Sequence, residues 1–157
     1  MGRIGGSGAL VRTVAFVLLW IFCGSSTSQS ADTLNHVQNV VDDLRGRLSI
    51  TVPVVVAFVP TEKLVVSVGH LNGQTDAFSL SIENGFVDRL SSDELDAVVA
   101  HELGHVWIYT HHPYLQTEEL ANEIAMRVVS RASLERLYEK VWAHKGGKGS
   151  LTYLPGE

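Results

Sequence analysis

Apolar residues recur every three or four positions along four stretches of the chain, which is the spacing of helices with one buried face. The predicted helices cover about residues 33–48, 92–110, 117–129 and 134–142. His112-Pro113 ends the second of these helices, because the residue before a proline avoids helical backbone. Thr117 then fits the N-cap of the third.

The segment between the first two helices has the pattern of strands. Its β-branched or alternating stretches are residues 50–59, 63–69 and 76–82, and Asn72-Gly73 marks a turn before the last of them. Residues 83–90 follow as a short helix or turn. This order predicts an α+β fold, in which a short, mostly antiparallel sheet of about three strands packs on the second and third helices.

The first thirty residues are typical of a secretory signal peptide. Arg3 and Arg12 give it a positive start, Val14–Cys23 is its apolar core, and Gly24–Ser30 is small and polar. The apolar core of about ten residues is short for a bilayer span, which favours cleavage before Ala31 over an uncleaved anchor. We therefore expect export to the periplasm or the cell exterior, with tethering to a membrane through this segment as the alternative.

The rest of the chain predicts one domain at residues 31–145, followed by a flexible tail at residues 146–157. A glycine-rich stretch, residues 145–150, forms the start of that tail. The net charge is −5 and the sequence has no basic cluster, which argues against nucleic-acid binding. Cys23, the sole cysteine, lies in the signal segment, so no disulfide is expected.

The candidate chemistry lies in the second predicted helix, where residues 101–105 read His-Glu-Leu-Gly-His. Ser91 and Glu94 fit a capping box that starts this helix. Residues four apart share one helix face, so His101 and His105 would present two imidazoles to one point. Glu102 could then deprotonate a water held there, which is the arrangement of metal-assisted hydrolysis. The small Gly104 would let another element approach the helix closely.

A catalytic zinc usually has three protein ligands, and two residues compete to be the third. Glu118 on the next helix is favoured, with Asn122 one turn later as acceptor for the far nitrogen of a ligand histidine. His111 is the alternative, because its spacing from His105 also occurs in zinc peptidases. That pattern, however, needs a glycine for a sharp turn where this chain has Ile108.

The stretch from Val65 to Val129, with its H-E-L-G-H and E-x-x-A-N motifs, resembles the gluzincin zinc peptidases. It is most similar to the family that contains the CAAX prenyl protease and the bacterial heat-shock membrane metallopeptidase. The resemblance implies a small, zincin-like catalytic core with one zinc ion and an extended peptide substrate. Two departures stand out: Asn122 replaces the family's usual Asp, and the family's transmembrane helices are missing from this minimal core.

The resulting hypothesis is a zinc-dependent metalloendopeptidase with Glu102 as general base. Residues 78–82 would pair with substrate as an edge strand. Candidate donors to the oxyanion are His111, His112 and Tyr109, just after the motif. The alternative is a catalytically idle, metal-bound interaction module. The intact Glu102 favours the enzyme, because a structural metal site needs no base.

Overall fold

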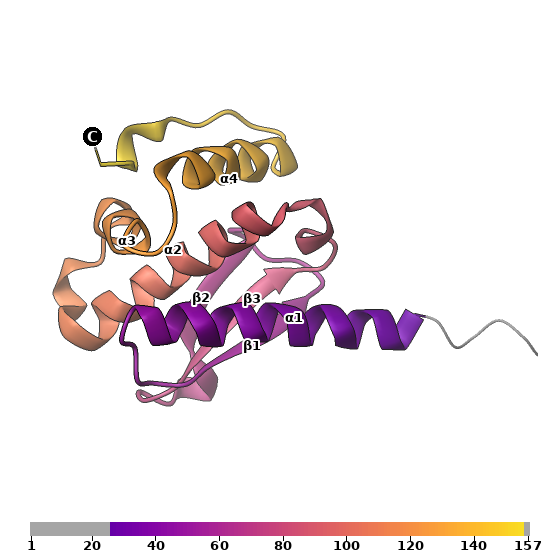
Figure 1. Ribbon diagram of the computed structural model, residues 1–157, viewed down its shortest axis with the longest axis horizontal. Coiled ribbons are helices and arrows are strands. Elements are labelled where there is room, and N and C mark those ends of the chain that lie inside the picture. Colours follow the sequence, from indigo (N-terminus) through magenta and orange to yellow (C-terminus); the bar gives the residue numbers. More distant parts are fainter. Residues whose placement is uncertain (1–25, 156–157) are drawn as a thin grey trace, which may run out of the picture.

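A three-stranded sheet lies beside the helix that carries the histidine pair (Figure 1). The computed structural model describes residues 26–155. Its elements are, in chain order, α1 (Ser26–Arg47), β1 (Val54–Val59), β2 (Val66–His70), β3 (Phe78–Glu83), α2 (Ser92–His111), α3 (Glu118–Ala125) and α4 (Arg131–His144). The expected α+β class with about three strands is confirmed, and the expected helices are present at nearly the predicted positions.

The strand directions differ from the prediction. The sheet order is β1-β3-β2, with β3 parallel to β1 and antiparallel to β2, so the sheet is mixed rather than mostly antiparallel. In the sequence β3 comes after β1 and β2, but in the sheet it lies between them. The prediction that residues 78–82 form a substrate-binding edge is therefore wrong, because their backbone is paired on both sides. Among the described strands, β2 is the edge strand on the side of α2.

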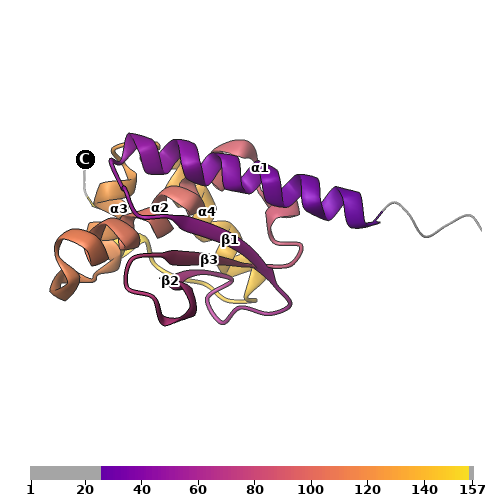
Figure 2. The same cartoon turned by 90° about the horizontal axis from the view of Figure 1, so that it is seen from below.

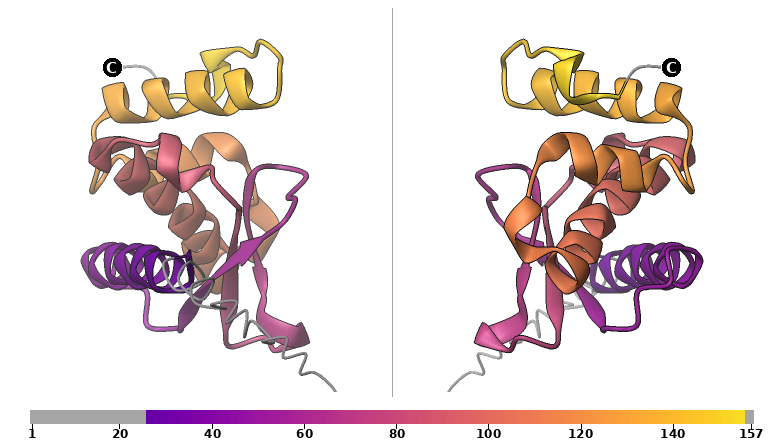
Figure 3. Two further views of the ribbon diagram at one scale, coloured as in Figure 1. Left: turned by 90° about the vertical axis from the view of Figure 1, so that its right-hand side faces the viewer. Right: turned by 90° about the vertical axis from the view of Figure 1, so that its left-hand side faces the viewer.

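The core lies between the sheet and the helices α1 and α2. Both helices lie on one side of the sheet, and α1 runs alongside β1 (Figures 2 and 3). Alternate residues of β3 point into this core, and Leu80 and Ile82 are fully buried there. Leu103, in the middle of the histidine motif, is buried in the same cluster. The motif therefore sits on a helix that tertiary packing holds firmly on several sides.

The N-terminal helix α1 begins at Ser26, earlier than the predicted start near residue 33. Its buried residues, Val37, Val41 and Leu44, follow the predicted helical spacing. The predicted signal segment at residues 1–30 lies mostly outside the described residues. Within residues 26–155, no helix has both the length and the apolar character needed to cross a membrane.

The C-terminal segment, for which the sequence predicts a flexible tail, packs back onto the domain as far as the structure describes it. After α4 the chain turns and runs back along that helix towards α3 (Figures 1 and 3). Gly149 lies so close to the Trp142 ring that a β-carbon there would overlap it. A single 3-10 turn, η4 (Leu151–Tyr153), is followed by the buried Leu154. The glycine-rich composition thus allows a close return of the chain.

Candidate metal centre

The motif helix α2 begins with the predicted capping box. The Ser91 backbone N–H donates to Glu94 Oε2 at 2.7 Å, and the Glu94 N–H donates to Ser91 Oγ at 3.4 Å. These two bonds satisfy N–H groups that the first turn of a helix leaves without partners. They fix the start of the helix whose later turns carry the histidines.

His101 and His105 lie on one face of α2, as their spacing predicts. Their ring centroids are 4.9 Å apart, and the two rings are nearly perpendicular. Glu118, the first residue of α3, places its carboxylate against both rings, with its oxygens 3.2 Å from His101 Nε2 and 3.5 Å from His105 Nε2. The three side chains bring one ligand atom each within 4.8 Å of the others.

The approach of α3 to α2 depends on local sequence at both helices. Thr117 caps α3, and its hydroxyl accepts the Leu120 N–H at 3.1 Å. On α2, a β-carbon at Gly104 would overlap the backbone carbonyl of Ala121. The prediction that Gly104 permits a close approach is confirmed, and the neighbour is the helix that carries Glu118.

Both histidine rings are held from behind by side-chain amides. His101 Nδ1 contacts Asn122 Oδ1 at 2.8 Å, as the sequence predicts. His105 Nδ1 contacts Gln116 Oε1 at 3.1 Å, and Gln116 Nε2 also donates to the His105 carbonyl at 3.2 Å. An amide oxygen can only accept, so each Nδ1 is placed to donate its hydrogen to the amide behind it, and each Nε2 faces the Glu118 carboxylate.

The charges in this group depend strongly on one another. Hydrogen bonds from His101 and His105 hold the pKa of the Glu118 carboxyl far below its usual range. Burial opposes protonation of His105, but hydrogen bonds to Glu118 and Gln116 outweigh it and raise the pKa of this histidine. Burial also raises the pKa of Glu102, although the nearby His101 and His105 partly offset the shift.

A cavity of about 380 Å³ borders the group. Its walls come from the edge strand β2, through Val66 and Val68, and from α4, through Tyr138 and Trp142. Glu102 lines the cavity together with both histidines and Glu118. The Glu102 carboxylate and three possible ligand atoms therefore share one space, which is bordered by the sheet edge and α4.

The donor set fits zinc. Two imidazole nitrogens and one carboxylate oxygen are the three protein ligands found in many catalytic zinc sites, where a water completes the coordination. A ligand histidine usually has an oxygen acceptor behind its other ring nitrogen, and the amide oxygens of Asn122 and Gln116 take that place here. The chemistry of this centre therefore suits a catalytic zinc better than a closed structural one, which typically has four protein ligands.

The other sequence candidates lie in different surroundings. His111 is exposed and stacks on the Trp107 ring at 4.1 Å, and its Nδ1 lies 2.9 Å from the Trp107 carbonyl oxygen. His112 is exposed at the end of α2. Of the three predicted oxyanion donors, Tyr109 borders the cavity, and its ring also contacts His70.

Two residues of the centre are absent from the sequence predictions. Gln116 lies in the loop before α3, where a polar residue has no periodic signal. Tyr138 lies on α4, at a position that the helical pattern assigns simply to the apolar face. Its hydroxyl contacts the Asn122 amide, and burial raises its pKa to about 12. A search for polar partners of Asn122 on the last helix could have found this tyrosine.

Comparisons with known proteins agree with the chemistry of this centre. The sequence profile described as peptidase family M48 matches residues 47–149, which include the whole His–His–Glu group. Among solved structures, the metallopeptidase zymogen of Pyrococcus abyssi abylysin superposes with a TM-score of 0.53 at 14% sequence identity. That match covers 73% of this chain and 99% of the other, so the two share a fold. No curated protein sequence matches the chain.

Proposed function

The chain belongs to peptidase family M48, and we propose that it acts as a zinc-dependent metalloendopeptidase. Membership of this family makes it a metallopeptidase, and the His101, His105 and Glu118 group provides a place for a metal. The observation that carries the proposal is that these three residues share a cavity with the buried carboxylate of Glu102. A site used only for structure has no need of such a base.

In this proposal the two Nε2 atoms and the Glu118 carboxylate hold the zinc. Bound zinc would polarise the substrate carbonyl and lower the pKa of a water towards ~7. The protein's own part is to fix the ligands: Asn122 and Gln116 hold the imidazole rings in the orientation that turns each Nε2 towards the place where the metal would bind.

Glu102 serves as the general base and then as the general acid. It accepts the proton of the attacking water and hands it to the leaving amine. Burial supports this role, because it raises the pKa of Glu102 towards the pH at which the group both takes up and releases a proton readily. The carboxylate that binds metal has the opposite shift, since hydrogen bonds from the histidines keep the pKa of Glu118 low.

The substrate of this reaction is an extended peptide that pairs with the edge of β2. Two observations support this placement. The described part of the sheet leaves one side of β2 without a partner strand, and Val66 and Val68 of the same strand line the cavity. A peptide added to that edge would lie across the ligand group, with main-chain hydrogen bonds holding it extended.

Export is a separate part of the proposal and rests on the sequence alone. The basic start, apolar core and small polar end of residues 1–30 favour a signal peptide cleaved before Ala31. N-terminal sequencing of the protein recovered from its native host tests this. A mature chain that begins near Ala31 is expected, and an intact Met1 in a membrane fraction would favour the tethered form.

Replacing the base without removing a ligand tests the function. Glu102→Gln should bind zinc like the wild type while hydrolysis of casein or a peptide library falls at least ~100-fold. Glu119→Gln, an exposed neighbour on α3, is the matched control and should keep full activity. Full activity of Glu102→Gln would contradict the mechanism. Zinc bound by a wild type that cleaves no peptide would favour the idle module.

A further inference from the structure

We propose that a second cavity, beyond Tyr109, binds a basic side chain, lysine or arginine, of the peptide that pairs with β2. The inference rests on the proposed function, because it takes the placement of the substrate on β2 from there. A basic residue of the substrate, two positions from the residue that lies at the metal centre, would then decide which peptides bind well.

The second cavity lies at the C-terminal ends of β2 and α2 and has a volume of about 670 Å³. Its lining also includes the start of β3 and residues of the loops beside these elements. Tyr109 borders both this cavity and the cavity of the metal centre. Strand β2 likewise reaches both, because Val66 and Val68 line the first cavity and His70 lines the second. A peptide that follows the edge of β2 would therefore pass both cavities.

The backbone of β2 turns alternate residues towards its free edge. In an antiparallel ladder the N–H and C=O of one residue point to the same side, and those of the next residue point to the other. At the end of the ladder the Leu71 N–H donates to the Ala77 carbonyl at 2.9 Å, so Leu71 faces the β3 side. Val68 faces the opposite side, where its backbone hydrogen-bonds to Glu102. His70, two residues after Val68, therefore also offers its backbone to the free edge.

Strand β2 and helix α2 run side by side from the metal centre to the second cavity. Val68 lies against Glu102, and the His70 and Tyr109 rings are in contact with their centroids 5.5 Å apart. Tyr109 is one helical turn beyond His105 on the same face, about 6 Å along the helix axis. The step from Val68 to His70 is about 7 Å along the strand. Because the two steps match, a peptide residue opposite His70 lies beside the second cavity when the residue opposite Val68 lies at the metal centre.

Three rings in mutual contact form one wall of the second cavity. The His70 ring lies 4.7 Å from the Phe78 ring, and the Tyr109 ring lies 5.8 Å from the Phe78 ring. Phe78 is buried, whereas His70 and Tyr109 are exposed and offer ring surface to a ligand. The face of a tyrosine ring attracts a cation, and the apolar stem of a lysine or arginine packs well on such a surface.

Asp76 gives the second cavity its charge. Among the described residues that line this cavity, Asp76 is the only carboxylate, and none is a lysine or arginine. Within residues 26–155 the Asp76 side chain has no hydrogen-bond or ion-pair partner. A basic side chain of the substrate suits both features, because its stem can pack on the rings while its cationic head meets the carboxylate. An acidic side chain would be repelled, and an apolar one would leave Asp76 without a partner.

Affinity selection with the zinc-loaded Glu102→Gln protein tests this subsite without requiring turnover. The probe is a synthetic library of short peptides, and the retained peptides are identified by mass spectrometry. Lysine or arginine should be enriched among them. The best-bound peptide, made again with norleucine in place of its basic residue, should bind ~5–10-fold more weakly. Moving the basic residue by one position should cause a similar loss, because neighbouring side chains of a strand point to opposite faces.

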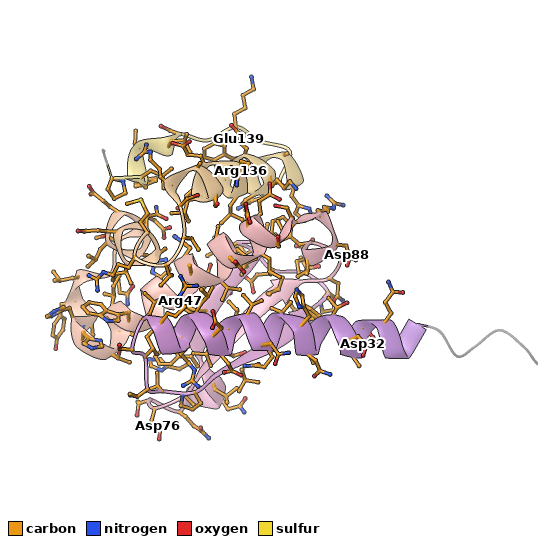
Figure 4. The ribbon with its side chains drawn as sticks, viewed as in Figure 1. Asp32, Arg47, Asp76, Asp88, Arg136 and Glu139 are labelled. Carbon is orange, nitrogen blue, oxygen red and sulfur yellow. The ribbon has the colours of Figure 1, made fainter. Side chains whose placement is uncertain are left out.

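Asp76→Asn, added to the Glu102→Gln protein, should reduce the preference for lysine over norleucine to under ~3-fold. Asp88→Asn is the matched control: it also removes one exposed carboxylate, but Asp88 lines a different cavity, well away from Asp76 (Figure 4), so the preference should stay unchanged. The proposal is overturned if no peptide is retained, if basic residues are not enriched, or if the two variants show the same preference. If the wild type failed to cleave the selected peptides, the proposed function would fail while the lysine preference stood.

Discussion

Gly104 of α2 and Ala121 of α3 are in backbone contact, and a β-carbon at Gly104 would lie 3.0 Å from the carbonyl carbon and the Cα of Ala121 and overlap its oxygen. This contact sets the separation of the two helices one turn after Glu118 begins the second of them. The ligand geometry at the metal centre therefore depends on the absence of a side chain at one position of the motif.

Gly104→Ala should force the two helices apart. We expect it to destabilise the protein by roughly 2 kcal/mol, since overpacking against rigid backbone exceeds the gain in helix propensity. Zinc affinity should fall as well, because Glu118 moves with α3. Urea denaturation in the presence of a chelator measures the first effect without metal, and a chelator competition measures the second.

Gly46→Ala provides the control for that experiment. Gly46 is also a helical glycine, in α1, but nothing lies within 4 Å of a β-carbon placed there. The control should be neutral or more stable by up to ~1 kcal/mol, with unchanged zinc affinity. If Gly104→Ala behaved like this control, the contact between Gly104 and Ala121 would determine neither the stability of the protein nor its zinc affinity.

The third ligand can be identified by removing each candidate. Glu118→Ala should abolish stoichiometric zinc binding, because the carboxylate is the group that faces both Nε2 atoms. His111→Ala should leave zinc binding unchanged, since His111 stacks on Trp107 and contacts its backbone. Metal content after dialysis distinguishes the two. Loss of zinc in His111→Ala alone would reverse the assignment.

Zinc binding should weaken as the pH falls, and the raised pKa of His105 determines the pH at which the loss of affinity begins. Hydrogen bonds to Glu118 and Gln116 favour the protonated ring of His105, so a proton competes with the metal at a higher pH than it would at a free imidazole. The apparent zinc affinity should drop ~10-fold for each pH unit below that pKa, the slope for one displaced proton.

Gln116→Ala tests how much Gln116 contributes to this pH dependence. It removes one of the hydrogen bonds that raise the pKa of His105, so the pH at which zinc affinity begins to fall should move down. The affinity at high pH should also fall, because the ring loses its orienting partner. Chelator competition over a pH series gives both quantities. If the pH at which zinc affinity begins to fall did not change, Gln116 would have no influence on the protonation of His105.

Features encoded by neighbouring residues could be predicted from the sequence. The capping box at Ser91, the shared face of His101 and His105, and the N-cap at Thr117 each depend on residues within one helical turn. The need for a small residue at Gly104 also follows from its place in the motif. The geometry of these features follows from the local spacing of residues and does not depend on distant parts of the chain.

Features set by long-range packing could not be predicted in the same way. The position of β3 between β1 and β2 does not alter the alternation of apolar and polar residues in any of these strands. The pattern of residues 78–82 therefore predicts an edge strand where the sheet has its central strand. The partners of Asn122 come from α4 and η4, and nothing near position 122 indicates them. The tail after α4 has a flexible composition, but one apolar residue, Leu154, anchors it.

Lys140 attaches α4, which forms one wall of the cavity, to the start of the motif helix. Lys140 Nζ lies 2.6 Å from Glu94 Oε2 and 2.5 Å from the Arg89 carbonyl, so it ties α4 to the start of the motif helix. Lys140→Met should destabilise the protein by about 1–2 kcal/mol at neutral pH, because Glu94 is buried and loses its cation. Arg136→Met is the control. Arg136 lies on the same helix as Lys140 (labelled in Figure 4), and the change removes its exposed ion pair with Asp93 of α2, which should cost under ~0.5 kcal/mol.

The pH dependence distinguishes this ion pair from simple packing by the lysine stem. Burial raises the pKa of Glu94, but hydrogen bonds from Lys140 and Ser91 outweigh it and hold the pKa below its ordinary value. The stabilisation is therefore fully present above the unfolded pKa of about 4.3 and is lost as the pH falls through the lower folded pKa. Urea denaturation of wild type and Lys140→Met should show a stability difference that narrows below about pH 4. A difference that stays constant into acid would mean that the Lys140 stem, and not its charge, holds α4 against the motif helix.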